Sequence, residues 1–246
     1  MAVATVSNAQ IIVGTFDVSG FVGTVSSTPG EVVKVPVPTF GSGGFMVEAA
    51  GVRSGSFGFD GFTDHGASGI ATAFTPANLG TQYGVSIAVP SSGAAPAAGD
   101  GALFGTGKLR RWAPLEASPS SAAGLSAEFG TDAAFAFGRV GAALASRTTS
   151  GLTGTAVALT GPSATQRLYA LLQVTAASGT NLVVKVQSDD NSGFTSATDR
   201  ITFSTLSAVG WEQSSVAGNL ATETYWRVVA TIASGSFTFG VCFGVA

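Results

Sequence analysis

Charged residues are what this chain has least of. Asp, Glu, Lys and Arg make up 10% of its 246 residues, against roughly 25% in an ordinary soluble domain. The net charge is −3, so the chain lacks the excess of Lys and Arg with which nucleic-acid-binding proteins displace counterions. Tight binding of DNA or RNA is therefore not expected. Because so few charges keep copies of the chain apart, we expect neighbouring molecules to cover much of its surface.

Cysteine is nearly absent. Cys242 is the only one, so no disulfide can form within the chain. It alternates with Val241 and Phe243, a pattern that predicts a buried structural thiol rather than a reactive one. The first residues lack the basic, then apolar, then small-residue order of a secretion signal, and no apolar run reaches the length of about 18 residues that spans a membrane. We expect a chain that tolerates a reducing compartment and does not cross a membrane.

Groups for acid–base catalysis are scarce as well. His65 is the single histidine, and although it follows Asp64, no G-x-S-x-G motif presents a serine for a catalytic triad, so a turn position is favoured. The run GALFGTGKL resembles a phosphate-binding loop only in part. Ala102 stands where a glycine is required, and Leu109 replaces the Ser or Thr that would hold magnesium. We predict no catalytic residue and no cofactor, and expect that the chain is not an enzyme.

Two polar clusters are weighed against simpler interpretations. The segment 189–191 in SDDNSGF, together with Asp199, could ligate calcium through its oxygens. Its spacing is not that of an EF-hand, and Asp and Asn are favoured in tight turns because they hydrogen-bond to nearby backbone, so a turn without metal is predicted. The segment 110–112 (RRW) could contact nucleic acid. We interpret it instead as a strand end that pairs with carboxylates of a neighbouring molecule.

What the chain has in abundance is a period of two residues. Apolar residues alternate with other residues over 167–174, 181–187, 225–232 and 237–243, which predicts strands with one buried and one wetter face. Further strands are predicted at 9–16, 20–25, 31–38, 53–62, 83–90, 102–112, 124–129 and 134–144. The strand at 31–38 is expected on a sheet edge because it contains Pro36 and Pro38. Helical spacing occurs over 67–79, where Pro76 interrupts it.

These patterns predict an all-β chain of two β-sandwich domains. Residues 1–145 would form the first, with one short flanking helix, and residues 155–246 the second. The segment between them, 146–154 (SRTTSGLTG), is small and polar, as is typical of a linker. The excess of negative charge falls entirely within residues 1–145, which hold nine acidic and six basic residues.

The most unusual segment is TFGSGGFMVEAAG, residues 39–51. It places glycines and apolar side chains around one turn: Thr39, Phe40, Gly41, Gly43, Gly44, Phe45 and Met46. Apolar side chains beside a glycine-rich turn either fold back onto the core of their own chain or dock on a neighbouring molecule. Both alternatives are open from the sequence.

Several motifs resemble those of a known family. In the first half, FDVSGF, TFGSGG, GFDGFTD and GDGALFGTGKL follow one another in a pattern similar to the tail tube proteins, also called major tail proteins, of long-tailed bacteriophages. In the second half, QRLYALLQVTAASGT, VKVQSDDNSGF, DRITF and YWRVVATIASGSFTFGV resemble the C-terminal portion of the same group. The resemblance covers nearly the whole chain, which is longer than the simplest tube subunits.

The resemblance implies a tail-tube-like β-sandwich whose copies join edge to edge into a ring, with rings stacked into a hollow tail. A ring of six copies is expected, or of three because this chain is longer. The segment 39–51 would reach the adjacent ring, and residues 155–246 would decorate the tube or enlarge its wall. The protein would be assembled in the host cytoplasm, would reside in the virion tail, and would meet other tail proteins at the ends of the tube.

The implied mechanism is passive. DNA that moves through the tube during ejection must not bind tightly, so an acidic or neutral lining suits the task. The acids that could line the channel are Asp17, Glu31, Glu48, Asp60 and Asp64.

Two other classes remain open. The chain could be another virion β-sandwich, such as a tail terminator, a neck protein or a capsid decoration protein. It could also be a carbohydrate-binding module, in which Trp112, Trp211 or Tyr225 stacks on sugar rings. A tube subunit would form rods or rings at high concentration, whereas a binding module would stay monomeric.

Overall fold

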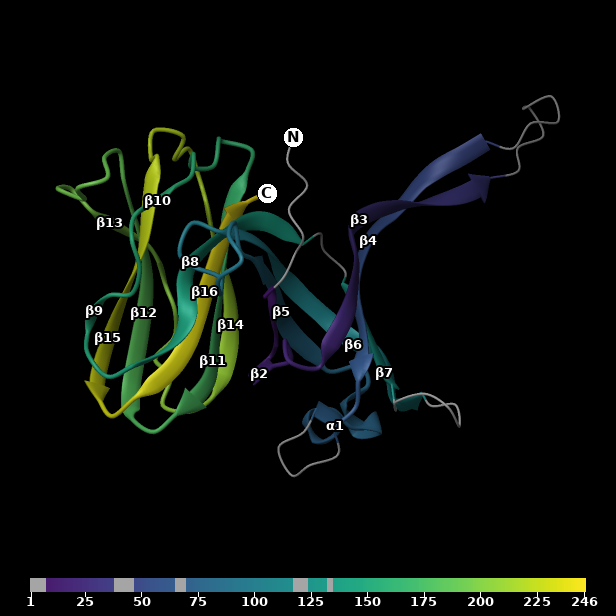
Figure 1. Cartoon of the computed structure of the whole chain (residues 1–246). Coiled ribbons are helices and arrows are strands. Elements are labelled where there is room, and N and C mark those ends of the chain that lie inside the picture. The colour runs from purple at the N-terminus through teal and green to yellow at the C-terminus, as the bar shows by residue number, and fades with distance from the viewer. Residues whose placement is uncertain (1–7, 38–46, 65–69, 117–123, 132–134) are drawn as a thin grey trace. The chain divides into compact units, whose positions relative to one another are not determined.

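The computed structural model describes residues 8–37, 47–64, 70–116, 124–131 and 135–246. Most of them lie in antiparallel strands, which confirms the all-β prediction (Figure 1). The helical parts of the described residues are α1 (Ile70–Ala73) and the 3-10 turn η1 (Pro76–Asn78), both within the predicted segment 67–79. Pro76 opens η1 rather than extending α1, because proline lacks the amide hydrogen that a continued helix requires.

Contacts between residues divide the chain into two compact units, and both are discontinuous in sequence. The first unit combines Met1–Gly20, Tyr83–Thr106 and Ala136–Ala246, and the second combines Phe21–Gln82 with Gly107–Phe135. Residues 146–154, predicted as a linker, belong to the first unit together with the strands on either side of them. The sequential division into 1–145 and 155–246 stays a prediction, and the grouping by contacts is a different one.

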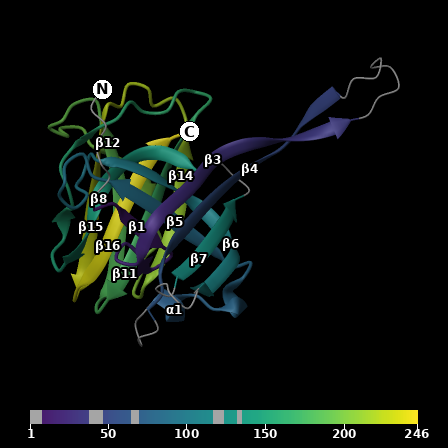
Figure 2. The ribbon, with the colours of Figure 1, turned by 45° about the vertical axis from the view of Figure 1, so that its right-hand side comes forward.

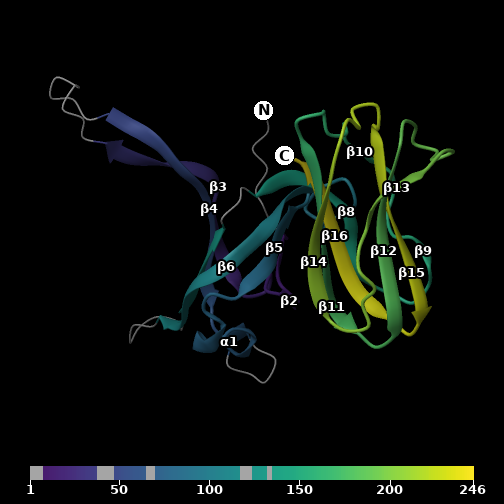
Figure 3. The same cartoon turned by 180° about the vertical axis from the view of Figure 1, so that it is seen from behind.

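The first unit holds most of the strands. They are β1 (Gln10–Val13), β2 (Phe16–Asp17), β5 (Gln82–Val89), the first part of β6 (Gly101–Glu116), β8 (Ala136–Arg147), β9 (Gly151–Leu152), β10 (Val157–Ala158), β11 (Arg167–Ala177), β12 (Thr180–Asp189), β13 (Thr198–Thr202), β14 (Gly210–Ala217), β15 (Tyr225–Ser234) and β16 (Phe237–Val245). One sheet has the order β14-β11-β16-β8-β6-β5-β1-β2, and the other β10-β15-β12-β13, with β9 also on β15. The second sheet packs on β11 and β16, as opposite views show (Figures 1 and 3).

The main core of this unit lies between its two sheets. It contains the alternating apolar residues that the sequence predicts to be buried: Leu168, Ala170, Leu172, Val174, Leu182, Val184, Val186, Trp226, Val228, Ala230, Ile232, Phe237, Phe239, Val241 and Phe243. Trp226 is fully buried, and its indole Nε1 donates to the carbonyl of Leu159 at 2.8 Å. The shared core fixes the register of the four strands, because a slip of one residue would turn these side chains outward.

The opposite face of β11 and β16 is buried too. Alternation predicted a wetter face there, and that prediction is wrong for these two strands, since Leu171, Gln173 and Cys242 are at most 7% exposed. Leu171 and Cys242 pack in a second cluster with Ala88 of β5 and Phe104 of β6. Burial raises the pKa of the Cys242 thiol to about 12, which confirms the structural thiol.

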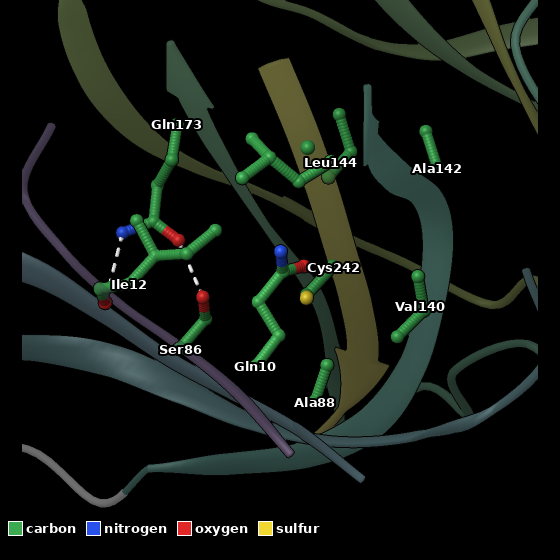
Figure 4. Close-up of a pocket in the computed structure, with 11 residues that line it drawn as sticks. Gln10, Ile12, Ser86, Ala88, Val140, Ala142, Leu144, Gln173 and Cys242 are labelled. Carbon is green, nitrogen blue, oxygen red and sulfur yellow. Dashed lines mark hydrogen bonds between the residues drawn. The ribbon is translucent and has the colours of Figure 1, made fainter. Parts of the chain in front are cut away.

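Gln173 joins β11 to the strands that cover this face. Its Nε2 donates to the carbonyl oxygens of Ile12 at 3.2 Å, Gly14 at 3.2 Å and Gly84 at 3.0 Å. Its Oε1 accepts a hydrogen bond from the hydroxyl of Ser86. Figure 4 shows the side chain reaching from β11 toward Ile12 and Ser86 at the edge of a small cavity. A polar residue is buried here without cost because its hydrogen bonds are made within the protein.

Arg147, at the end of β8, fastens the segment that follows it. Its Nη1 donates to the carbonyls of Ala145 at 3.0 Å and Phe239 at 2.7 Å, and its Nη2 to those of Ala143 at 2.7 Å and Thr153 at 3.3 Å. The guanidinium also lies 4.4 Å from the centroid of the Phe239 ring. Burial lowers the pKa of Arg147, and the group remains a cation because its ordinary pKa is so high. The segment 146–154 is thus held against the sandwich.

Replacing Arg147 with Met should lower the stability of the first unit by about 2–3 kcal/mol, because the replacement leaves part-buried carbonyls without donors. The control is Arg167→Met, because the exposed guanidinium of Arg167 bonds only to the Ser215 hydroxyl, at 3.1 Å and 3.2 Å, among the described residues. Equilibrium unfolding in urea, followed by the fluorescence of Trp211 and Trp226 with Trp112 of the second unit replaced by Phe in both variants, measures both changes. Equal midpoints for the two variants would contradict the role given to Arg147.

The second unit contains the strands β3 (Val22–Val37), β4 (Val47–Phe62), β7 (Gly124–Thr131) and the second part of β6, together with α1. These strands pair in the order β3-β4-β7-β6 and belong through β6 to the same sheet as β8 and β5. The core of the second unit is aromatic. The ring centroids of Phe57 and Phe129 lie 5.9 Å apart, and Phe74 and Trp112 meet edge to face at 5.3 Å. Ile70 and Phe74, from α1 and the residue that follows it, are buried as the predicted helical spacing requires, whereas Leu79, the third apolar residue of that spacing, is 48% exposed.

Strand β3 corrects the sequence prediction. Segments 20–25 and 31–38 were expected as two strands, but Val22–Val37 forms one. The Pro29–Gly30 pair that suggests a break is accommodated by a shift of register between Thr28 and Glu31 opposite β4. Segments 198–202 and 210–217, which were not predicted as strands, form β13 and β14.

Candidate assembly surfaces

The outer part of the β3–β4 hairpin is a two-stranded ribbon. β4 pairs with β7 through Gly55–Phe62 only, whereas its pairing with β3 continues to Val37 opposite Val47. Within the described residues, 31–37 and 47–54 therefore pair only with each other. Figure 2 shows this ribbon running out beyond β6 and β7 of the same unit. We call 31–37 and 47–54 the outer ribbon.

An isolated two-stranded hairpin is marginally stable in water, because it leaves both rows of outward backbone groups to the solvent and buries little apolar surface. The inner part of the hairpin avoids this problem through β7, and the outer ribbon has no third strand among the described residues. Pro36 lies in β3 opposite Glu48, and β4 is the one partner of β3 among the described strands, which confirms the edge position expected for Pro36.

The structure describes only the second part of the predicted assembly segment, residues 39–51. Residues 38–46, which include Thr39, Phe45 and Met46, lie outside the described residues. Residues 47–51 were expected in the loop but belong to β4, so this part of the prediction is wrong. The predicted loop extends into β4 because Ala49, Ala50 and Gly51 have a low intrinsic propensity for strands. Their strand conformation is determined by pairing with β3.

The five acids predicted for a channel do not all belong together. Asp17, on β2 of the first unit, accepts hydrogen bonds from the Ser19 backbone amide at 3.0 Å and from Gln10 Nε2 at 3.3 Å, so it shapes a turn. Glu31, Glu48 and Asp60 belong to the β3–β4 hairpin of the second unit, and Asp64 follows β4 two residues after its end. Asp60 is exposed. A role in a channel stays a prediction for all five.

Asp60 lies on the outer face of the second-unit sheet, opposite the aromatic core. The Cα partners of Asp60 are Thr24 on β3 and Ser126 on β7. Two residues before Asp60 on β4, and on the same face, Gly58 has Ser26 and Glu128 as its Cα partners. This polar face, with exposed Glu128, was not proposed from the sequence. The alternation of Glu128 with the buried Phe129 and Ala127 could have revealed it.

Cations share this sheet with the acids. Lys108 and Arg110 are exposed on β6, and the Arg110 guanidinium lies where any side chain at Gly130 would have to sit. β6 continues to Glu116, so residues 110–112 lie within a strand, and the prediction that they form a strand end is wrong. Arg111 has Glu128 of the same chain as its Cα partner.

The remaining candidates for chemistry have structural roles or lie outside the described residues. Asp189 accepts from the backbone amides of Ser196 at 2.8 Å and Asn191 at 3.3 Å, and Asn191 accepts from Gly193 at 2.7 Å, which confirms the predicted turn. The bond from Ser196 is the main cause of the lowered pKa of Asp189. No group of three potential metal ligands occurs in the described part of the chain. His65 is not among the described residues.

None of the helices in the described ranges is long and apolar enough to cross a membrane.

Comparison with known proteins gives weak likenesses. No family model matches the chain, and no curated protein matches it. Among solved structures, the Dit protein of SPP1, described as a paradigm of the hub adsorption apparatus in phages that infect Gram-positive bacteria, is similar over 97% of this chain and 99% of its own, with 10% identity and a TM-score of 0.34. The baseplate of phage p2 in its activated conformation matches over 95% and 97%, with 9% identity and a TM-score of 0.30. Likenesses this weak do not establish a family or a function.

Proposed function

We propose that this protein is a structural subunit of a bacteriophage tail, and that its copies assemble into stacked rings around a passage for DNA. The observation that carries the proposal is the outer ribbon, because a two-stranded extension of this length is stable only when another surface covers it. The motif resemblance to tail tube proteins and the low content of charged residues support the same conclusion.

Open strand edges provide the lateral contacts of such a ring. Among the described strands, β3 in the second unit pairs only with β4, and in the first unit β14 pairs only with β11 and β13 only with β12. Each such strand has one row of backbone groups that a neighbouring copy can pair with. A head-to-tail contact between different edges closes into a ring when its rotation divides a full turn, and six or three copies satisfy this condition.

The outer ribbon provides the axial contact. Seven residues of paired strand, 31–37, extend about 23 Å, and over this length the ribbon would reach toward the next ring. Residues 38–46 connect the two strands of the ribbon in the sequence, and their apolar side chains would dock on the adjacent ring.

In this proposal the subunit performs no reaction. DNA passes without tight binding, because a subunit with a net charge of −3 does not attract the negatively charged phosphates. Other tail proteins would bind the two ends of the tube. The protein would be found in the virion tail after assembly in the host cytoplasm.

Electron microscopy of the purified full chain tests the proposal. Rods or stacked rings are expected as the concentration rises, and light scattering should show growth in one dimension. Single rings that never stack would favour a tail terminator or a neck protein instead. Featureless monomers at every concentration and salt would contradict assembly.

A further inference from the structure

The outer face of the β12–β15 pair carries a connected row of polar side chains. Lys185 and Gln187 of β12 share this face with Arg227 of β15, while the residues between them point into the core. Both strands are central, because β12 pairs with β13 and β15, and β15 pairs with β9, β10 and β12. No backbone edge is therefore free at this place, and anything that binds here must be recognised by side chains.

The row is held by three short hydrogen bonds. Lys185 Nζ bonds to Asp199 Oδ2 at 2.7 Å, and Gln187 Nε2 donates to the other oxygen, Oδ1, at 2.7 Å. Arg227 Nε donates to Gln187 Oε1 at 2.8 Å. The orientation of the Gln187 amide is thus fixed from both ends, and the guanidinium of Arg227 is fixed through it. A group ordered in this way loses little conformational entropy when it binds a ligand.

Phe194 covers one face of the same guanidinium. Its ring centroid lies 4.3 Å from Arg227 Cζ, a cation–π contact. The backbone of Phe194 has φ of 52°, which is unfavourable for a bulky residue. The loop that holds it is tied down by the carboxylate of Asp189 and by Asn191. Residues kept in unfavourable conformations by their surroundings are concentrated at functional sites.

The terminal nitrogens of Arg227 are left for a ligand. Within the described part of the chain, its bonds are the one from Nε and the contact with Phe194, and neither uses Nη1 or Nη2. Arg200, in contrast, is already bonded to other residues of the chain. Its Nη2 donates to Glu223 at 2.9 Å, and its Nε donates to Ser188 at 2.8 Å. The carboxylates of Asp199 and Asp189 on this face are engaged by other groups: Asp199 accepts from Lys185 and Gln187, and Asp189, two residues beyond Gln187 on β12, accepts from the backbone amides of Asn191 and Ser196.

From these observations we infer that the outer face of the β12–β15 pair binds an acidic saccharide, whose carboxylate is bound by Nη1 and Nη2 of Arg227. The two parallel N–H groups match the two oxygens of a carboxylate. Nearby hydroxyls and amides are suited to sugar hydroxyls, since Thr202 and Thr231 are exposed on the same face and Tyr225 lies one step along β15 from Arg227. This site does not depend on the proposed ring assembly.

The test is a titration of the full chain by isothermal calorimetry at low salt, with a tetrasaccharide of alternating glucuronate and N-acetylglucosamine as the probe. We expect a dissociation constant below about 1 mM. A neutral tetramer of N-acetylglucosamine should bind at least about tenfold more weakly, because it presents no anionic group to the guanidinium. No binding of the glucuronate probe, or equal binding of the neutral tetramer, would overturn the inference.

Variants separate binding from stability. Arg227→Gln should weaken binding of the glucuronate probe at least about tenfold, and Arg227→Lys by a smaller factor, because Lys keeps the charge and loses the two parallel donors. Arg167→Gln is the control, an exposed cation bonded to Ser215 elsewhere in the unit, and should bind like the unchanged chain. Phe194→Gly relieves the backbone and removes the ring, and it should also weaken binding. If these variants change only the melting temperature and leave the affinity unaltered, the row is purely structural.

Discussion

Removing the outer ribbon should give a folded protein that no longer forms rods. Glu31 and Ser54 are Cα partners, so an Asn-Gly turn can replace residues 32–53 and join them directly. The inner part of the hairpin keeps its pairing with β7 from Gly55 to Phe62, and the aromatic core around Phe57 is untouched. We therefore expect the thermal unfolding temperature to change little and axial assembly to disappear, with electron microscopy showing single rings or monomers.

A matched control shortens a different hairpin of the same unit. Glu116 of β6 and Gly124 of β7 are also Cα partners, so residues 117–123 can be replaced by the same Asn-Gly turn. This variant should still form rods. Full-length rods from the protein without residues 32–53 would refute the axial role of the ribbon, whereas loss of rods from both variants would show that assembly is merely sensitive to shortened loops.

Replacing Gln173 with Leu should destabilise the first unit by about 3 kcal/mol or more. Leu is close in size, but the carbonyls of Ile12 and Gly14 would lose the Nε2 donor and the Ser86 hydroxyl would lose the Oε1 acceptor inside the protein, and each buried unsatisfied group costs about 1–3 kcal/mol. Gln173→Glu should be worse, since a buried carboxylate would face the same carbonyl oxygens. Urea unfolding followed by tryptophan fluorescence measures the loss.

Gln213 provides the comparison for this effect. It lies on β14 opposite Leu171, is half exposed, and makes no side-chain hydrogen bond within the described residues. Gln213→Leu should therefore change stability by less than about 0.5 kcal/mol. If Gln173→Leu is as mild as Gln213→Leu, the contact between β11 and the strands β1 and β5 is not maintained by this side chain.

The strands of the first unit were largely predictable because their pattern is local. Alternation alone predicted the buried apolar residues between Leu168 and Phe243, because the residues of a strand that face the core recur at every second position of its own sequence. The same pattern could not show that Gln173 and Leu171 are covered as well. That depends on β1 and β5, as the bonds of Gln173 to Ile12, 161 residues away in the chain, and to Gly84, 89 residues away, show.

The sequence predicted where the candidate assembly surface lies, but not that it includes a long two-stranded ribbon. The glycines and apolar residues at 39–46 indicated an unusual turn. The length of the strands leading to it was hidden by Pro29 and Gly30 on one side and by Ala49 to Gly51 on the other. Propensity is weak at such positions and cross-strand pairing overrides it. Glu128 and the row ending at Arg227 were missed because polar residues in alternation look alike, whether they face solvent or hold one another.

The discontinuous units have a consequence for synthesis on the ribosome. Residues 21–135 contain every strand of the second unit, so that unit has its complete sequence while more than a hundred residues are still to be translated. The first unit must wait for β16, near the carboxyl terminus, to close its core. The outer ribbon of a nascent chain can therefore form before the two sheets of the first unit pack together. Neighbouring nascent chains on one messenger RNA can then bind each other through their ribbons before they are released.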